Sequence, residues 1–459
     1  MSTPVLDTTF VREALGARLR ALDGPAATFT RAIIDSRRAG PGDLFVALPG
    51  EHVDGHDFAA DAVARGASGV LLTRPVEGTA GAACIVTDDA LASMQQIAAA
   101  WREALAGTVI LGVTGNVGKS TTKLIAAAVL SKRYSVQVNE ANYNNEIGVP
   151  LCLLELRPET ERAVIEMGMY TTGEIAGLCE WTHPRMGIVL NVGPVHLERA
   201  GSLEAIARAK RELPEALPAD GHAILNGDDS AVRAMAPYTK AHVWLIGTSD
   251  DADVRGTGIE SHGAKGFDFT LEYGVVSARV HVPLPGAHLL PNVLAAAAAG
   301  LADEVPFANI VTAIEALEIP TRLSVRSLPD GVTLLDDTYN ASPAATIAAL
   351  DLLAETPGRR IALLGDMLEL GAMTEPEHDR VGQRAAQVCD ALFTVGTLAQ
   401  RISDSARANG LGQATHCTSK GEVVGVLRAI LQPGDVLLVK ASRALALETV
   451  VQALEGGAR

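Results

Sequence analysis

The residues with the clearest chemical potential lie in one stretch, Gly112-Val-Thr-Gly-Asn-Val-Gly-Lys-Ser-Thr-Thr-Lys123. An apolar run, Val109–Val113, predicts a buried strand before it, and a helix is expected from Ser120 to Leu130. The backbone N–H groups of such a turn and of the following helix start bind phosphate oxygens. Lys119 could reach the β- and γ-phosphates of a nucleotide, and the Ser120 hydroxyl could ligate Mg2+. The stretch therefore predicts a nucleotide phosphate site.

This stretch departs at one position from the strict pattern G-x-x-x-x-G-K-[ST]. Val113 stands where the first glycine would be, with Gly112 and Gly115 on either side. The alternative is an ordinary strand–helix turn that happens to contain Gly-Lys-Ser. The strand before the turn and the helix after it are the context that a phosphate site requires, and they favour that interpretation.

Two further groups of polar residues follow the same stretch. Glu166 ends the apolar run Ala163–Met167, where a carboxylate could hold Mg2+ beside nucleotide phosphates; by itself it could equally be a solvated or capping residue. Three asparagines, Asn142, Asn144 and Asn145, carry amides that both donate and accept hydrogen bonds. They suit a polar ligand that crosses a domain cleft, although a loop rich in turn-forming residues would look the same.

Polar clusters also occur near both ends of the chain. Ser36 and Arg37 lie on a predicted loop, where they could bind a phosphate or the edge of a uracil, or simply form a solvated turn. In the last third, clusters follow predicted strands at Asp336-Asp-Thr-Tyr-Asn-Ala-Ser-Pro343, at Gly365-Asp-Met-Leu-Glu-Leu-Gly371 with His378, and at Lys440-Ala-Ser-Arg443; Arg322 lies upstream at a Pro-Thr-Arg junction. Because ligands bind at the carboxyl ends of strands in α/β sheets, these clusters predict a second part of the site.

The elements that must position these residues alternate between short apolar strands and helices, which predicts an α/β fold. A length of 459 residues suggests about three domains. We expect a small N-terminal α/β domain over residues 1–105, a central doubly wound phosphate-loop domain over residues 106–319, and a C-terminal Rossmann-like α/β domain over residues 320–459. Within the central domain, a helix is expected over Leu203–Leu217 and an antiparallel β insertion over Val254–Val282.

Composition excludes several classes of protein. The net charge is −16 and there is no basic stripe, which argues against nucleic-acid binding. The five cysteines are scattered without a Cys-x-x-Cys pair, so neither a disulfide framework nor a zinc site is indicated. Met1–Arg20 is polar and helix-like without a signal-peptide core, and the alanine-rich run Val293–Ala302 is too short to span a bilayer. We expect a cytoplasmic protein without stable membrane insertion.

Together, these motifs resemble the ATP-dependent Mur ligase family over nearly the whole chain. The resemblance rests on the polar clusters above and on Asp54-Gly-His56, Ile165-Glu-Met-Gly168, Asn191-Val-Gly-Pro-Val-His196, and His288 with Asn292. It implies ATP-driven amide-bond formation through an acyl phosphate, with the UDP end of the substrate on the first domain and the incoming amine on the third.

Within the family, Asp336–Pro343 is the discriminating segment. It resembles the members that join D-alanyl-D-alanine to UDP-N-acetylmuramoyl-tripeptide, which gives UDP-N-acetylmuramoyl-pentapeptide, ADP and phosphate in peptidoglycan precursor synthesis. A carboxylate–amine ligase of the same superfamily with another acceptor is the alternative. A nucleotide-dependent regulator is a more distant one, because a GTPase switch would carry an Asn-Lys-x-Asp motif that this sequence lacks.

The resemblance also implies individual roles. ATP is expected to contact Thr114, Gly115, Asn116, Gly118, Lys119, Ser120, Thr121, His288, Asn292, Arg322 and Asp337. The substrates are expected to contact Ser36, Arg37, Asn142, Asn144, Asn145, Tyr339, Asn340, Ser342, Ser442 and Arg443. The expected catalytic residues are Lys119, Glu166, His196 and Lys210, and the expected ligands of two Mg2+ ions are Ser120, Glu166, His196 and Lys210.

Lys210 takes its role from the resemblance alone. It matches the lysine that is carbamylated in many Mur ligases, where the carbamate is an anionic ligand for a second Mg2+ beside the residue matched by His196. By their own sequence context, Lys210 would be a solvated helical lysine and His196 a surface loop histidine. The protein is also expected to be a monomer.

Overall fold

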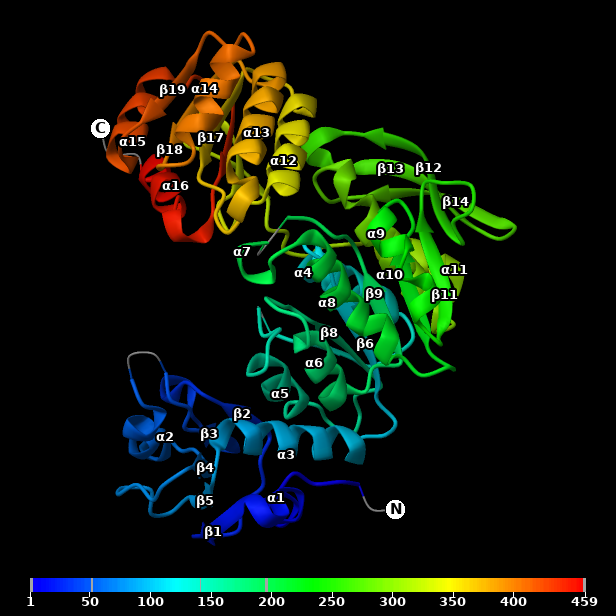
Figure 1. The fold of residues 1–459 in the computed structure, drawn as a ribbon, viewed down its shortest axis with the longest axis vertical. Coiled ribbons are helices and arrows are strands. Elements are labelled where there is room, and N and C mark those ends of the chain that lie inside the picture. The colour runs from blue at the N-terminus through cyan, green and yellow to red at the C-terminus, as the bar shows by residue number, and fades with distance from the viewer. Residues whose placement is uncertain (1–2, 51–52, 141, 195–196, 457–459) are drawn as a thin grey trace.

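The computed structural model describes residues 3–50, 53–140, 142–194 and 197–456, and this part of the chain forms three successive β-sheets. In Figure 1 the domains built on these sheets lie along the long axis, with the N-terminal domain at one end and the C-terminal domain at the other. Helices pack on sheets whose strands are mostly parallel, which confirms the expected α/β class.

The N-terminal sheet has the strand order β1-β5-β4-β3-β2, with only β1 antiparallel to its neighbour among these strands. Its strands are β1 Leu19–Asp23, β2 Arg31–Ile33, β3 Asp43–Val46, β4 Gly69–Leu72 and β5 Ala83–Thr87, and its helices are α1 Thr8–Leu15, α2 Ala59–Ala64 and α3 Ala90–Ala104. The helical character expected as far as Arg20 was wrong for Leu19 and Arg20, which begin β1; a 3-10 turn covers Gly16–Arg18 after α1. Gly16 ends α1 at a positive φ of 51°, and strand β1 begins three residues later.

The central sheet has the order β14-β13-β12-β11-β10-β9-β6-β8-β7. Its strands are β6 Val109–Thr114, β7 Val136–Val138, β8 Arg162–Glu166, β9 Met186–Val189, β10 His222–Asn226, β11 His242–Gly247, β12 Val254–Ser261, β13 Phe267–Tyr273 and β14 Val276–Val282. Its helices are α4 Lys119–Leu130, α5 Gly148–Leu153, α6 Glu174–Thr182, α7 Leu197–Ala200, α8 Leu203–Ala216, α9 Ser230–Arg233, α10 Leu290–Ala302 and α11 Phe307–Glu315. Strands β6, β8, β9 and β10 are buried almost throughout, as parallel strands between two helical layers must be, whereas the edge strand β7 is only partly buried.

Strands β12, β13 and β14 form the antiparallel segment expected over Val254–Val282. This β-meander continues the central sheet, because β12 pairs in parallel with β11 through Ile246 opposite Val254. One face of the meander supplies Phe267, Phe269 and Val280 to the core of the domain, and the other face is exposed to solvent.

The alanine-rich run Val293–Ala302 forms all but the first three residues of α10, which is buried against α4 and the sheet. Small side chains allow this helix to approach α4 closely, and a Cβ at Gly300 would lie 2.5 Å from a methyl group of Val129. Among the described helices, none is long and apolar enough to cross a bilayer.

The C-terminal sheet has the order β15-β16-β20-β17-β18-β19. Its strands are β15 Ser324–Ser327, β16 Thr333–Asp337, β17 Arg360–Gly365, β18 Ala391–Val395, β19 Ala414–Cys417 and β20 Val436–Lys440, and its helices are α12 Pro343–Glu355, α13 Thr374–Val388, α14 Gln400–Ala408, α15 Lys420–Ile430 and α16 Glu448–Glu455. The last strand, β20, lies between β16 and β17. Residues that are distant in sequence therefore meet at the carboxyl end of this sheet.

Candidate active site

The phosphate loop, defined here as residues 114–120, joins β6 to α4 and is held from two sides. The Oδ1 atom of Asn191, after β9, accepts the backbone N–H groups of Asn116 and Val117, each at 2.9 Å. On the other side, Asn292 donates from Nδ2 to the Gly118 carbonyl at 3.0 Å. Gly118 has a φ of +91°, and a Cβ there would lie 2.3 Å from Asn292 Nδ2, so this position requires glycine.

Asn191 already accepts hydrogen bonds from two backbone N–H groups of this loop. We therefore expect an anion to bind at the start of α4. The first N–H groups of a helix have no intrahelical partner and carry the positive end of the helix dipole. Lys119 lies at this start, and its Nζ donates to the carbonyls of Gly115 at 2.8 Å and Asn116 at 3.2 Å. Burial lowers the pKa of Lys119, while the charge of Glu166 opposes that shift. An ammonium group has three donors, so one N–H is left for a phosphate oxygen.

Glu166, at the end of β8, faces the phosphate loop from the neighbouring strand. Its side chain is 1% exposed, and its Oε2 accepts a hydrogen bond from Ser120 Oγ at 2.7 Å. The Oε1 atom accepts from Asn144 Nδ2 at 2.8 Å. Lys123 Nζ lies 3.9 Å from Oε2 and donates to the Asn139 carbonyl at 2.6 Å. The structure thus brings together a hydroxyl and a carboxylate, which are oxygen ligands suited to Mg2+.

The three asparagines of the sequence have different environments. Asn144 holds Glu166, whereas the Oδ1 of Asn145 accepts the N–H groups of Ile147 and Gly148 and caps the start of α5. Asn142 is exposed. Asn139 was not predicted, yet its Oδ1 accepts the backbone N–H of Glu166 at 3.0 Å. The sequence gives little indication of this role, because an asparagine after the short strand β7 has no local feature that predicts a hydrogen bond with β8.

Lys210 lies in α8 and is buried, contrary to the ordinary expectation for a helical lysine. Burial lowers its pKa well below the usual value, and the nearby charge of Lys119 lowers it further. Within the described part of the chain, its amine has no hydrogen-bond or ion-pair partner. His196, the other residue expected at a second metal ion, lies outside the described residues.

A cavity of about 360 Å³ opens between the central and C-terminal domains. Its central-domain wall includes the predicted residues Asn116, Gly118, Ser120, Thr121, His288 and Asn292, together with Asn191 and Asn226. Its C-terminal wall includes the predicted residues Arg322, Asp337, Asn340 and Ser342, together with Lys440. Thr114 is buried beneath the loop, where its hydroxyl donates to the Met167 carbonyl at 2.9 Å.

Charged side chains connect the two walls. Arg322 donates from Nη2 to Ser120 Oγ at 3.3 Å, and its guanidinium lies 4.6 Å from the ring centroid of Tyr339.

Asp337 and Lys440 form a buried ion pair at 2.5 Å. Burial lowers the pKa of Lys440, and Asp337 opposes this shift. Burial also lowers the pKa of His288, which favours its neutral form at the cavity.

Other predicted residues of the C-terminal domain hold its loops. Ser442 is buried, and its hydroxyl accepts the N–H of Leu368 at 2.9 Å. Arg443 pairs with Glu448 at 3.0 Å and lies 6.0 Å from the Tyr339 ring centroid. Neither Ser442 nor Arg443 lines the cavity. Through these contacts with Tyr339 and with the loop after β17, both residues lie beside the carboxyl ends of the same strands.

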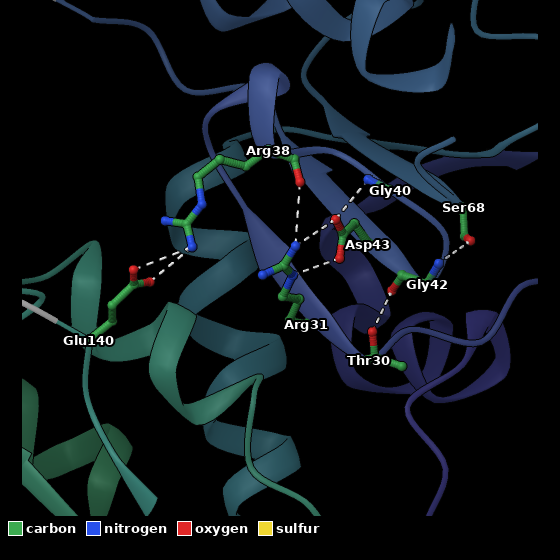
Figure 2. Close-up of polar contacts among 8 residues, drawn as sticks. All are labelled: Thr30, Arg31, Arg38, Gly40, Gly42, Asp43, Ser68 and Glu140. Atoms are coloured by element: carbon green, nitrogen blue, oxygen red, sulfur yellow. Dashed lines mark hydrogen bonds and ion pairs between the residues drawn. The ribbon is translucent and has the colours of Figure 1, made fainter. Parts of the chain in front are cut away.

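The N-terminal cluster lies beside the central domain. Ser36 donates to Asp61 Oδ2 at 2.8 Å, whereas Arg37 pairs with Asp35 and keeps 82% of its side chain exposed. Figure 2 shows how the next residue, Arg38, reaches across to Glu140, with a separation of 3.0 Å between Nη2 and Oε2. Glu140 directly follows Asn139, so the contact links this loop to the segment that positions Glu166.

Figure 2 also shows what holds the turn after this loop. Arg31 Nε donates to Asp43 Oδ1 at 2.8 Å, and Asp43 Oδ2 accepts the N–H of Gly40 at 2.9 Å. The N–H of Gly42 donates to Ser68 Oγ at 2.8 Å. These internal contacts use most of the polar groups in the turn, and Arg37 keeps more of its side chain exposed than Arg38.

None of the five cysteines lines the cavity. Burial raises the pKa of the Cys152, Cys179 and Cys389 thiols to about 12, so these thiols stay protonated near neutral pH. All five cysteines are free in the structure.

Comparisons with known proteins agree with the layout of these domains. Residues 29–106 match the family model "Mur ligase family, catalytic domain", residues 113–300 match "Mur ligase middle domain", and residues 321–443 match "Mur ligase, glutamate ligase domain". The UDP-N-acetylmuramoyl-tripeptide–D-alanyl-D-alanine ligases of Escherichia coli and Mycobacterium tuberculosis are 38% and 37% identical to this chain. The Escherichia coli alignment covers 95% of both chains, and the Mycobacterium tuberculosis alignment covers 92% of this chain and 91% of the relative.

Solved structures are similar over the same extent. A crystal structure of MurF from Acinetobacter baumannii has a TM-score of 0.89 at 29% identity and covers 99% of this chain and all of its own. A MurF ligase from Thermotoga maritima in complex with ADP has a TM-score of 0.79 at 28% identity and covers 93% of this chain and 97% of its own.

Proposed function

This chain belongs to the Mur ligase family, and we propose that it joins D-alanyl-D-alanine to UDP-N-acetylmuramoyl-tripeptide with ATP as the energy source. The named relatives and the MurF structures support this activity. The observation that carries it is the cavity in which the phosphate loop faces Arg322, Asp337 and Lys440 of the C-terminal domain. A reaction between a nucleotide and an acceptor held on separate domains requires such a shared space.

The phosphate-binding residues of this chain have a defined task in the proposed reaction. The start of α4 and the remaining N–H of Lys119 bind the phosphates of ATP, and Arg322 adds positive charge from the C-terminal domain. Ser120 and Glu166 would hold Mg2+, which supplies charge neutralisation between the triphosphate and the substrate carboxylate. Without positive charge, these two anions would repel each other.

The reaction that we propose has two steps. The terminal carboxylate of the tripeptide attacks the γ-phosphorus of ATP, which releases ADP and forms an acyl phosphate. The amine of D-alanyl-D-alanine then attacks the acyl carbon, loses a proton and displaces phosphate, which leaves a new amide bond. The chain contributes by placing the reacting groups together and by excluding water that would hydrolyse the acyl phosphate.

The domains divide the substrates in this proposal. Residues 1–105 bind the UDP end through Ser36 and Arg37, residues 106–319 bind ATP, and residues 320–459 bind the dipeptide near Tyr339, Asn340 and Ser342. A single copy of the chain carries both walls of the cavity, so we propose a monomer. The proposed site of action is the cytoplasm, which agrees with the free thiols.

Lys210 has a further role in the proposal. A buried lysine with a lowered pKa holds the neutral amine that reacts with carbon dioxide, and the resulting carbamate is an oxygen ligand for a second Mg2+. The absence of a partner for its amine among the described residues agrees with such a modification.

The test is ADP release by the purified chain. UDP-N-acetylmuramoyl-tripeptide is supplied with and without D-alanyl-D-alanine, and the product is identified by mass spectrometry. We expect sustained ADP release and a pentapeptide product only with the dipeptide. Turnover with a single amino acid instead would support the alternative, a related ligase with another acceptor. No turnover with any amine would contradict the proposal.

A further inference from the structure

The exposed face of the β-meander, strands β12 to β14, carries a cluster of metal-binding side chains. Asp268 on β13 lies directly opposite His281 on β14 in the strand register. His262 follows the end of β12 and completes the cluster. The strands alternate, so Phe267 and Phe269 enter the core while Asp268 points to solvent.

The three side chains converge on a small volume. His281 Nδ1 lies 2.7 Å from Asp268 Oδ1, and His262 Nε2 lies 3.2 Å from Asp268 Oδ2. One ligand atom from each residue can be chosen so that all three lie within 4.8 Å of one another. The two imidazole rings are stacked, with centroids 6.2 Å apart. All three side chains keep about a third or more of their surface accessible, so an ion can reach them from solvent.

We propose that His262, Asp268 and His281 bind a divalent transition-metal ion of the Zn2+ type. Zinc takes imidazole nitrogen at about 2.0–2.1 Å and carboxylate oxygen at about 2.0–2.2 Å, which places neighbouring tetrahedral ligands about 3.4 Å apart. The contacts of 2.7 and 3.2 Å lie close to that spacing, and all three ligand atoms already lie within 4.8 Å of one another. Water fills the remaining position. Two imidazoles favour zinc, copper or nickel over Mg2+, which prefers oxygen ligands.

A backbone hydrogen bond and the neighbouring charges are compatible with such a site. The N–H of His262 donates to the Gly266 carbonyl at 2.8 Å, which closes the turn between β12 and β13. The nearby cation, Arg279, lies 4.0 Å from Asp268 Oδ2 but is closer to Glu260, at 3.2 Å. Glu260 therefore offsets the positive charge that would otherwise oppose a metal ion at Asp268.

The cluster lies apart from the cavity and beside a different contact between domains. None of its three residues lines the cavity. Its neighbour Ser261 donates to Glu355 Oε2 at 2.5 Å, and Gly263 packs against the Glu355 backbone at the end of α12. A bound ion would rigidify the turn that contacts the C-terminal domain, which gives the site a structural role.

The test is calorimetric titration of Zn2+ into the full-length chain after treatment with a chelator and in the absence of nucleotide. We expect one equivalent of Zn2+ to bind to the wild type. His262→Gln and His281→Gln should each weaken binding at least about tenfold, since loss of even an outer-shell partner costs about 10–100-fold. His242→Gln is the matched control, because this exposed histidine of β11 lies outside the cluster.

Two further measurements separate this site from the proposed Mg2+ site and from misfolding. Glu166→Gln should retain the Zn2+ equivalent, because Glu166 belongs to the other site. Cobalt substitution should give a visible absorption band that both cluster variants lose, while their circular dichroism stays that of the wild type. Absence of stoichiometric binding, or equal affinity in the cluster variants and the wild type, would overturn the inference.

Discussion

The Ser120 hydroxyl donates a hydrogen bond of 2.7 Å to Glu166, which joins the start of α4 to the end of β8. The two elements meet because β6, which leads through the phosphate loop into α4, pairs directly in parallel with β8. Arg322 donates to the same hydroxyl from the C-terminal domain. A change at this hydroxyl or its carboxylate partner should therefore alter contacts in both domains.

Asn144→Ala should impair nucleotide use, whereas Asn145→Ala should lower stability. Asn144 orients the carboxylate of Glu166, and a hydrogen bond to a charged group contributes about 1.5–3 kcal/mol. We expect the KM for MgATP to rise about tenfold to a hundredfold. Asn145 caps α5, so its loss should cost about 1 kcal/mol of unfolding free energy with nearly normal kinetics. Steady-state kinetics and urea unfolding of both variants distinguish these outcomes; equal effects in both assays would contradict the assignment.

Lys119→Ala should abolish measurable turnover while the fold survives. The lysine lies at the start of α4, where in the proposed reaction it would neutralise charge that develops on the transferred phosphoryl group. Removal of one such contact typically slows turnover by about a hundredfold to a thousandfold. The measurement is ADP release, with thermal unfolding as the control for folding. Activity within about tenfold of the wild type would rule out this role.

Arg37→Ala should raise the KM for the UDP substrate about tenfold and leave that for ATP nearly unchanged. The arginine is more exposed than its neighbour Arg38, and it lies on a different domain from the phosphate loop. Arg18→Ala is a matched control, because Arg18 is also an exposed, ion-paired arginine of the N-terminal domain. An equal rise for both substrates would indicate misfolding or a different binding surface.

Lys210→Ala should lose most activity, and a small exogenous carboxylate should restore part of it. Burial lowers the pKa of Lys210, which favours the neutral amine, the form that captures carbon dioxide. Nuclear magnetic resonance of the enzyme with carbon-13 bicarbonate and nucleotide should show a carbamate signal that the variant lacks. An unmodified Lys210 pointing to solvent in an active, nucleotide-bound crystal would exclude the carbamate.

Binding of all substrates should close the cleft between the central and C-terminal domains. The cavity walls belong to both domains, and the junction Pro320–Arg322 lies between them. Small-angle scattering should show a smaller radius of gyration with UDP-N-acetylmuramoyl-tripeptide, a non-hydrolysable ATP analogue and the dipeptide than with none. An unchanged radius would count against closure.

The local sequence was sufficient to predict the phosphate loop and the strand and helix that flank it. The apolar run before Gly115 and the Gly-Lys-Ser sequence after it are local features, and the strand–loop–helix that they predict is present. The antiparallel nature of Val254–Val282 was likewise predictable, because alternating side chains and glycine turns act over neighbouring residues. The position of Glu166 at a strand end followed from the same reasoning.

The tertiary structure alone determines which polar residues contact one another. Asp337 and Lys440 are 103 residues apart, and they pair because β20 inserts between β16 and β17, which places the two residues opposite each other in register. The same applies to the asparagines: Asn144 faces Glu166 while its neighbour Asn145 turns to α5. Strand order and the direction of a side chain on an irregular loop depend on long-range packing, which the spacing of residue types along the chain does not encode.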